Sequence, residues 1–394
     1  MTHGTPITRR RFIASATAVA VASVSATAVA EATLTTDDRA ARSAARSGSA
    51  PGFRVPIDSV PHTRTWMAWP DSTAIWGSRL LRGAQEDIAR IAATIARYEP
   101  VVVLANHRSA ADAQAACGSA VDVIHDIPVN DCWMRDTGPI FRVNEHGHLD
   151  AVGLNFNGWG KKQVHNDDAL VARRIAARLG VPFTAAGLVC EGGAIDCDGD
   201  GTLMATESSI INPNRNPGKT RAELEAAMNA AYGTTKVIWF KGIRGQDLTD
   251  DHVDATSRFT GVARGMVQYP RQADDHNMWS NDERHQYDVL SRATSAHGTP
   301  IDTTKLLGPT WNKIRQHRND GFVDSYANYY VCNGAVICAQ FGDTEADAQA
   351  AAKIGGAFPG RVVEPLNIDA LGIGGGGIHC VTQQQPAARD RRAD

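Results

Sequence analysis

One cysteine near the C-terminus follows an unusually dense run of glycines. The segment from Gly372 to Cys380 reads GIGGGGIHC. Glycine permits backbone conformations and close approaches that side chains prevent, so such a run can present a thiol into a pocket. The other cysteines form no CxxC pair and no set with zinc spacing, so we expect buried, inert thiols there. Cys380 is therefore the candidate nucleophile, and a glycine hinge beside a buried cysteine is the alternative.

The same run matches the nucleotide pattern G-x-G-x-x-G, but its surroundings do not fit. A dinucleotide site needs a helix after the glycines and an acidic residue about 20 positions later. Here IHCVTQ follows and the chain ends at Asp394. No Lys-Ser or Lys-Thr pair follows either, so a phosphate-binding loop is excluded as well.

A cysteine nucleophile needs a proton carrier, and His252 is the best candidate. It precedes Asp254 by two residues, and in an extended strand these two side chains would share one face. The alternative is a helix start capped by one of the two aspartates before His252. His379 adjoins Cys380, but in a strand neighbours face opposite sides, which argues against His379 as the base.

Further carboxylates occur in two motifs. The segment NDCWMRDTGPIF places Asp131, Trp133 and Asp136 close together, and Glu191 precedes two glycines. Such carboxylates could hold a cation, whereas a surface ion pair beside a turn is the alternative for the first motif.

A calcium-loop pattern follows Glu191 and is better explained by a hairpin. Its pattern residues are Asp196, Asp198, Asp200, Gly201 and Glu207. A calcium loop needs a helix on each side, whereas the flanking residues here suit strands and DGDG favours a tight turn. We expect a polar hairpin and no metal.

A Cys/His pair alone suggests acyl transfer, as in a cysteine peptidase. Several carboxylates around the thiol would oppose a developing oxyanion, but they suit a cationic substrate. A guanidinium is planar, permanently charged and able to pair with carboxylates through two N–H groups at once.

The elements that position these residues alternate between strands and helices, which predicts one α/β body over residues 51–386. Predicted strands are Thr65–Trp69, Val101–Ala105, Val121–Ile127, Pro139–Val143, Ala151–Phe156, Thr202–Ile211, Val237–Phe240, Gly261–Tyr269, Asn328–Gln340 and Arg361–Leu366. Predicted helices are Arg82–Arg97, Asp168–Leu179, Arg221–Ala231, Gln286–Ala296 and Asp343–Ile354.

Both ends of the chain are expected to lie outside this body. Residues 1–30 carry consecutive arginines, an Ala/Val/Ser stretch and a final A-x-A, which indicate a twin-arginine export signal. We expect a flexible linker over 31–50 and a polar tail over 387–394. The predicted location is periplasmic or extracellular, or cytoplasmic if the signal does not function. A retained membrane anchor is the alternative, and the net charge of −3 argues against nucleic-acid binding.

The chain resembles agmatine deiminases and the bacterial peptidylarginine-deiminase-like group of the guanidine-modifying superfamily. The matching stretches are TWMAWP (65–70), WMRDTGP (133–139), EGG with the DGDG turn (191–201), NPNRNPG (212–218), HVD (252–254), YANYYVCNGAVICAQFGD (326–343) and GGGGIHCVTQQQP (374–386). This resemblance implies a single-domain, five-bladed, pseudo-symmetric α/β propeller of the pentein type with a central active site. It also implies a mechanism without metal or organic cofactor.

The resemblance further implies a role for each candidate. Cys380 would form an amidino-thioether, Asp136 and Asp254 would hold the guanidinium, and His252 would protonate ammonia and then activate water. Glu191 would orient the imidazole. Residues lining the substrate pocket would be Trp133, Asp131, Gly376 and Gly377.

The expected reaction converts agmatine and water to N-carbamoylputrescine and ammonia, a step toward putrescine. Peptidyl-arginine or another guanidine is the alternative substrate. A non-enzymatic exported protein that binds cations, and an amidinotransferase, are weaker alternatives. The expected partner is a small cationic guanidino compound, with no membrane contact after signal removal; homo-oligomerisation is left open.

Overall fold

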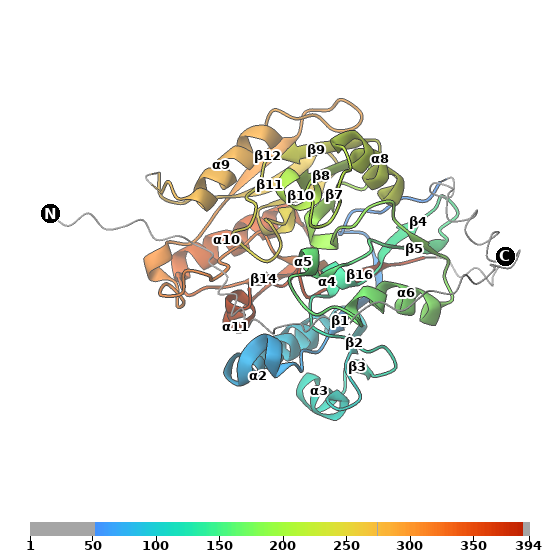
Figure 1. Ribbon diagram of the computed structural model, residues 1–394. Helices are drawn as coiled ribbons and strands as arrows, with labels where there is room; N and C mark the ends of the chain where they lie inside the picture. The colour runs from blue at the N-terminus through green and yellow to red at the C-terminus, as the bar shows by residue number, and fades with distance from the viewer. Residues whose placement is uncertain (1–51, 274, 389–394) are drawn as a thin grey trace, which may run out of the picture.

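The computed structural model describes residues 52–273 and 275–388, which form a single α/β domain containing five sheets (Figure 1). The proposed export signal, the linker and most of the polar tail therefore lie outside the described residues. The first sheet has the order β16-β1-β2-β3. Its strands are β1 (His62–Ala68), β2 (Val101–Leu104), β3 (Val121–Ile124) and β16 (Gln383–Pro386).

The other four sheets have three consecutive strands each. They comprise β4 (Ile140–Val143), β5 (Leu149–Gly153) and β6 (Phe183–Ala185); β7 (Ile195–Cys197), β8 (Thr202–Thr206) and β9 (Lys236–Phe240); β10 (Ser257–Gly261), β11 (Arg264–Tyr269) and β12 (Asp302–Leu307); and β13 (Tyr330–Cys332), β14 (Ala335–Ala339) and β15 (Val362–Leu366).

All five sheets repeat one pairing pattern. An antiparallel pair comes first, and its second strand then pairs in parallel with a third strand. A parallel connection must cross over the sheet, and here each crossover contains a helix. These crossover helices are α2 (Thr73–Ile95), α6 (Asp168–Leu179), α8 (Arg221–Tyr232), α9 (Met278–Leu290) and α10 (Thr344–Ala357). In the first sheet the antiparallel partner of β1 is β16, so the end of the domain completes the sheet begun at its start.

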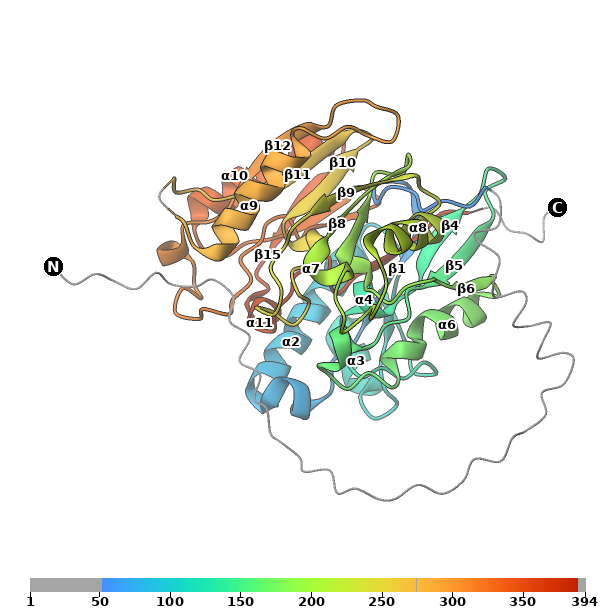
Figure 2. The same ribbon diagram turned by 45° about the horizontal axis from the view of Figure 1, so that its top comes forward.

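The remaining helices are short. Helices α4 (Met134–Thr137) and α11 (Asp369–Ile373) lie between the repeated units, whereas α3 (Ala110–Cys117), α5 (Gly158–Lys161) and α7 (Glu207–Ile210) lie within them. Three 3₁₀ turns cover Gly192–Ala194, Val253–Ala255 and Trp311–Lys313. Figure 2 shows α9 and α10 lying beside the sheets at the edge of the domain, whereas α4 lies nearer its centre.

The crossover helices were largely predictable from periodicity and caps. Helix α6 has the predicted bounds, and α8 begins after Thr220, which forms a capping box with Glu223. The predicted helix Gln286–Ala296 is wrong, because α9 begins after Asn277, whose side chain accepts from two backbone N–H groups, and it ends at Leu290. The predicted strand Thr202–Ile211 is also too long, since α7 follows β8 directly.

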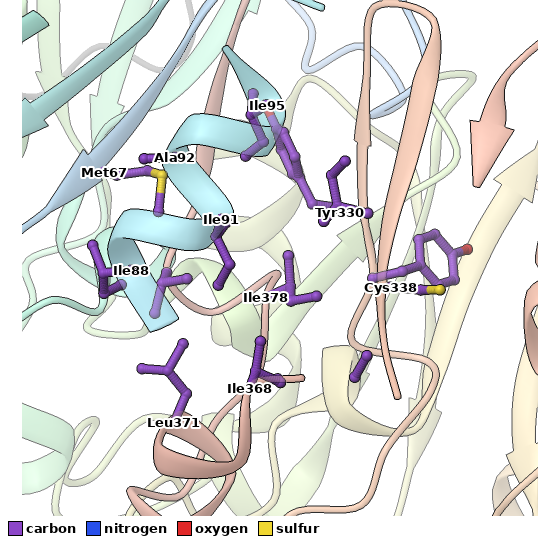
Figure 3. Close-up of a cluster of buried hydrophobic side chains, with 14 of the residues drawn as sticks. Met67, Ile88, Ile91, Ala92, Ile95, Tyr330, Cys338, Ile368, Leu371 and Ile378 are labelled. Atoms are coloured by element: carbon purple, nitrogen blue, oxygen red, sulfur yellow. The ribbon is translucent and has the colours of Figure 1, made fainter. Parts of the chain in front are cut away.

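The largest apolar core joins α2 to the strands beside it (Figure 3). Ile88, Ile91 and Ile95 of α2 are completely buried, as are Leu371 and Ile378 from the C-terminal segment. Each such side chain contributes about 1.5–3 kcal/mol relative to exposure. The segment leading to Cys380 is thus packed against the domain rather than free to move as a hinge.

The DGDG segment forms the predicted hairpin between β7 and β8. Asp198 Oδ1 accepts the N–H groups of Asp200 (2.8 Å) and Thr202 (2.9 Å), which fixes the turn. Asp196 instead accepts the Phe259 N–H, and Glu207 pairs with Arg221. The acidic residues therefore serve separate structural contacts, and the paired strands β7 and β8 occupy the segment that a calcium loop would need.

Across residues 52–273 and 275–388, no helix is both long and apolar enough to cross a membrane.

Candidate active site

The candidate catalytic residues occupy equivalent places in four of the repeated units. Asp136 lies in α4 before β4, and Glu191 lies just before β7. His252 and Asp254 precede β10, and Cys380 precedes β16. Because each lies at the entrance to the first strand of a unit, the fold can gather residues that are distant in sequence.

Gly193 marks the point where three of these side chains meet. A methyl group built there would lie 2.8 Å from His252 Nδ1 and 3.0 Å from both Asp136 Oδ1 and Asp254 Oδ2. His252, Asp136 and Asp254 therefore surround one small space. Cys380 joins them, since its Sγ lies 3.8 Å from Asp254 Oδ2.

Cys380 differs from every other cysteine of the chain in exposure. It is partly exposed, whereas the other six are buried, as predicted. Its sulfur accepts an N–H bond from Asn328 Nδ2 at 3.2 Å. Burial raises the pKa of the Cys380 thiol well above its usual value, and the carboxylates of Asp254 and Asp136 add to the rise. The free site therefore favours the thiol, and a bound cation would favour the thiolate.

His252 bonds to Glu191, and Glu191 is itself held by Arg215. His252 Nε2 donates to Glu191 Oε2 at 3.1 Å, and Arg215 Nε lies 2.8 and 3.0 Å from the two Glu191 oxygens. Burial opposes a charged imidazole, but Asp136, Glu191 and Asp254 outweigh it and raise the pKa of His252 to about 9. The imidazole thus carries a proton at neutral pH.

The expected strand around His252 is wrong. His252 precedes a 3₁₀ turn, Val253–Ala255, and Asp250 and Asp251 before it have positive φ angles of 63° and 71°. Asp250 is fixed there by Arg215 (2.7 Å) and by the Gly245 N–H (2.8 Å). The two site side chains, His252 and Asp254, still reach one point, although through a turn and not through strand alternation.

Asp136 is held by the indole of Trp159 and the backbone of Gly193. Trp159 Nε1 donates to Oδ2 at 2.9 Å, and the Gly193 N–H donates to Oδ1 at 3.0 Å. Trp159 adopts a positive φ of 53°, a strained conformation for an aromatic residue. Burial raises the pKa of Asp136 to about 6, a rise that Glu191 and Asp254 reinforce and His252 opposes.

Asp254 has one engaged and one free oxygen. Its Oδ2 accepts from His379 Nδ1 at 2.7 Å, while its Oδ1 is buried with no hydrogen-bond partner among the described residues. Burial raises the pKa of Asp254, but His379, His252 and Arg258 outweigh it and lower the pKa overall. An ionised carboxylate with a free buried oxygen is suited to receive an N–H group of a guanidinium.

His379 does not face away from Cys380 as expected. Residues 378–381 form a turn instead of a strand, and His379 and Cys380 both contact Asp254 Oδ2. The far nitrogen, His379 Nε2, lies 3.2 Å from Asp58 Oδ2. Burial lowers the pKa of His379, and Arg135 and Arg258 lower it further. His379 therefore acts as a hydrogen-bond partner that holds Asp254 in place.

A cavity of about 250 Å³ lies next to Trp133, and none of the side chains of this cluster is among its lining residues. Asp131 and Trp133, two of the residues predicted to bind substrate, line it together with Trp76, whose ring stacks on that of Trp133 with 5.8 Å between the ring centroids. Asp131 accepts N–H bonds from Trp76, Trp133 and Gln163 at 2.7–3.0 Å. The lining contains no lysine or arginine.

Gly376 and Gly377 are not among the residues lining this cavity, whereas Gly374 is. A methyl at Gly376 would lie 2.3 Å from the Trp133 ring, and one at Gly377 would lie 2.5 Å from Asn328 Oδ1. These glycines provide the space in which Trp133 and Asn328 pack, and their part in substrate binding stays a prediction.

Comparison with known proteins identifies the family of this chain. Residues 54–386 match the model of the Porphyromonas-type peptidyl-arginine deiminase family. The chain belongs to this family. A Streptomyces coelicolor protein named as an agmatine deiminase is 37% identical over 341 residues, which cover 85% of this chain and 99% of the relative.

Solved structures of deiminases share the fold. The agmatine deiminase of Enterococcus faecalis has a TM-score of 0.79 and 28% identity, covering 86% of this chain and 98% of that one. A Porphyromonas gingivalis protein described as an arginine deiminase has a TM-score of 0.74 and 27% identity, covering 86% of this chain and all of that one.

Several residues of this deiminase site were not predicted from the sequence. They are Asn328 at the thiol, Trp159 at Asp136, Arg215 at Glu191, and Gly193 at the point of convergence. Asn328 and Arg215 lie within the stretches that resemble the family, but an amide or arginine carries no local signal of a site. Their roles appear only when distant turns are brought together.

Gly193→Ala should disable the site while leaving the fold largely intact. The added methyl would displace His252, Asp136 or Asp254, so we expect guanidine hydrolysis to fall by about 10²-fold or more. The matched control is Gly356→Ala in α10, where a methyl meets nothing within 4 Å. Steady-state kinetics and thermal melting of both variants check this; wild-type activity in Gly193→Ala would contradict the assigned convergence.

Proposed function

We propose that this protein hydrolyses the guanidinium group of a small cationic substrate, with agmatine as the best-fitting compound. The observation that carries the proposal is the convergence of Cys380, His252, Asp136 and Asp254 around one buried space. The shared family and the relatives named as agmatine deiminases support it.

In the proposed first half-reaction, Asp136 and Asp254 bind the guanidinium nitrogens and keep the central carbon electrophilic. The Cys380 thiolate attacks that carbon, forming an S–C bond. Protonated His252 gives its proton to the departing nitrogen, and the C–N bond breaks to release ammonia. An amidino-thioether on Cys380 remains.

In the second half-reaction, neutral His252 accepts a proton from water as the water oxygen attacks the same carbon. Collapse of the intermediate breaks the S–C bond, returns the Cys380 thiolate and leaves a ureido product. Glu191 holds His252 in position throughout, and Arg215 keeps Glu191 ionised by lowering its pKa against the effect of burial. The sum is one guanidine and one water converted to one ureide and one ammonia.

The cavity favours agmatine over the alternative guanidines. The α-carboxylate of free arginine would find no cationic side chain in its lining. The apolar and aromatic walls suit an aliphatic chain, and the carboxylate of Asp131 favours a positive charge nearby. A volume of about 250 Å³ is below the roughly 300–1,000 Å³ typical of drug-sized ligands, which suits a small molecule better than a peptide.

Turnover of three substrates tests this preference. Ammonia release from agmatine should exceed that from free arginine by about 100-fold in kcat/KM, because arginine would bury an unpaired carboxylate. A peptide ending in arginine should also be poor. Cys380→Ala should lose turnover by about 10³-fold or more. Preference for the peptide would favour peptidyl-arginine as the substrate, and binding without turnover in the reduced wild type would indicate a non-catalytic cation-binding protein.

Agmatine affinity should weaken in acid because Asp136 must be ionised to bind a cation. In Cys380→Ala, which cannot turn over, affinity should fall about tenfold per pH unit below the Asp136 pKa of about 6 and change little from pH 6.5 to 8. Calorimetric titration between pH 4.5 and 8 measures this. Asp136→Asn in the same background should bind weakly without the step near pH 6; affinity independent of pH in the parent variant would contradict the role of Asp136.

We also propose that the five sheets are the blades of a closed, pseudo-fivefold propeller of the pentein type. The repeated pairing pattern and the pairing of β16 with β1 support this arrangement. In such a ring, the entrances to the first strands face a common centre, which would explain why the site residues occupy equivalent places.

Export remains our proposal for the N-terminal segment, on the basis of its arginines and A-x-A end. Fusing residues 1–50 to a reporter that needs export should direct it out of the cytoplasm of a host with a twin-arginine system. Replacing Arg10 and Arg11 with lysine should block that export. If the reporter fused to the unaltered segment stays in the cytoplasm, the proposal is refuted.

A further inference from the structure

Lys162 joins two separate turns of the domain. It follows α5 directly, and its Nζ lies 2.8 Å from Asp250 Oδ2. The same ammonium group donates to the backbone oxygens of Leu248 (3.0 Å) and Asp247 (3.3 Å). One cation from the unit of β4–β6 therefore holds three acceptors in the turn that leads to His252.

The turn before His252 needs such contacts because its backbone is strained. Asp250 has a positive φ of 63°, which costs energy in a residue other than glycine. On the buried side of the turn, Arg215 donates to Asp250 Oδ2 (2.7 Å) and to the Thr249 backbone oxygen (2.9 Å). Thr249 Oγ1 in turn accepts the backbone N–H of His252 at 3.2 Å. Lys162, whose side chain is 31% exposed, holds the turn from the solvent side.

The segment that carries Lys162 also reaches Asp136. The Asn157 side chain caps α5, since its Oδ1 accepts the Gly160 N–H at 2.7 Å. Trp159 in the same segment donates its indole N–H to Asp136. One short, capped segment therefore orients both a carboxylate that would bind the guanidinium and the turn of the proton carrier.

The contacts form a row of alternating charges. Burial raises the pKa of Asp250, but Lys162 and Arg215 outweigh it and lower the pKa overall, so this carboxylate is ionised and accepts from both cations. Ion pairs link Lys162, Asp250, Arg215, Glu191 and His252 in that order. Lys162 is the member that solvent reaches, because the side chains of the other four are at most 3% exposed.

We propose that Lys162 is a positioning residue for His252, which it holds in place through Asp250 and the backbone of the preceding turn. The inference deepens the proposed function and rests on it only for the catalytic role of His252. Because a solvent-exposed ion pair contributes little to stability, the lysine serves the position of the imidazole more than the folding of the domain.

The titration of His252 tests this proposal without any substrate. Burial opposes the charged imidazole, but the three carboxylates around it outweigh burial and raise its pKa to about 9. Lys162→Met should let the turn relax and move the imidazole away from these carboxylates, so we expect this pKa to fall by about one unit. Loss of a positive charge acting only through space would raise it instead, which separates positioning from long-range electrostatics. Nuclear magnetic resonance with isotope-labelled histidine measures the titration, and His252→Asn assigns the signal.

Steady-state kinetics give a second readout. A displaced proton carrier slows both half-reactions, so kcat for agmatine should fall about tenfold in Lys162→Met. Agmatine affinity in the Cys380→Ala background should change little, because His379 holds Asp254 independently of the lysine. Lys162→Arg can make the same contacts and should restore most of kcat and the wild-type titration of His252.

Lys161→Met is the matched control. Lys161 is the neighbouring lysine, is exposed, and its side chain makes no hydrogen bond or ion pair among the described residues. Its replacement should leave the titration of His252 and kcat unchanged. Lys162→Gln, which removes the charge but keeps a polar side chain, serves as the second variant if Lys162→Met does not fold, and it should shift both readouts in the same direction.

Thermal melting shows that the variants are folded. A folded Lys162→Met protein in which the pKa of His252 is unchanged or raised would overturn the proposal. Failure of the proposed function would look different, since guanidine turnover would be absent in the wild type while the titration of His252 still responded to Lys162.

Discussion

Three buried carboxylates surrounding one imidazole are the constraint on which the rest of this site depends. Asp136, Glu191 and Asp254 are 0–6% exposed, and burying such charges together is costly unless each is paired. Arg215 pairs with Glu191 and His379 bonds to Asp254, while His252 shares its charge among all three. The negative charge of the cluster is not fully balanced by these contacts. Asp254 keeps one oxygen without a hydrogen-bond partner, and the pKa of Asp136 is raised. A guanidinium would supply the positive charge that these two groups lack, and the same charge would make thiolate accessible at Cys380.

Holding that cluster together requires a rigid framework, which the repeated units provide. Each site residue lies in a short segment before a first strand, and each segment is fixed by contacts that the strand alone could not provide. Asp250 and Asp251 adopt left-handed conformations before His252, and Trp159 does so beside Asp136. A strained backbone conformation persists only where contacts with the surrounding structure hold it in place. Here the strained residues are those that orient the site.

The sequence was informative where the signal was local. The crossover helices, the DGDG hairpin and the exposure of Cys380 relative to the other cysteines followed from periodicity, turn chemistry and glycine density. The boundaries of α9 were missed because the Asn277 cap outweighed the apolar pattern further along. The strand assumed for His252 and the opposite orientation of His379 were wrong because both segments are turns, where the two-residue alternation of a strand does not apply. The fivefold repetition leaves no exact sequence repeat, since only the pairing pattern recurs. Asn328 and Arg215 could not be recognised as neighbours of the site without the fold that unites them.

The most direct test of the account is to trap the covalent intermediate. The protein is mixed with excess agmatine, quenched in acid within the first turnovers, and digested for mass spectrometry. The account predicts that the peptide containing Cys380 gains the mass of agmatine less ammonia, and that the adduct disappears as substrate is consumed. Steady agmatine hydrolysis by an enzyme that carries the adduct on another residue, or by Cys380→Ala at the wild-type rate, would contradict it.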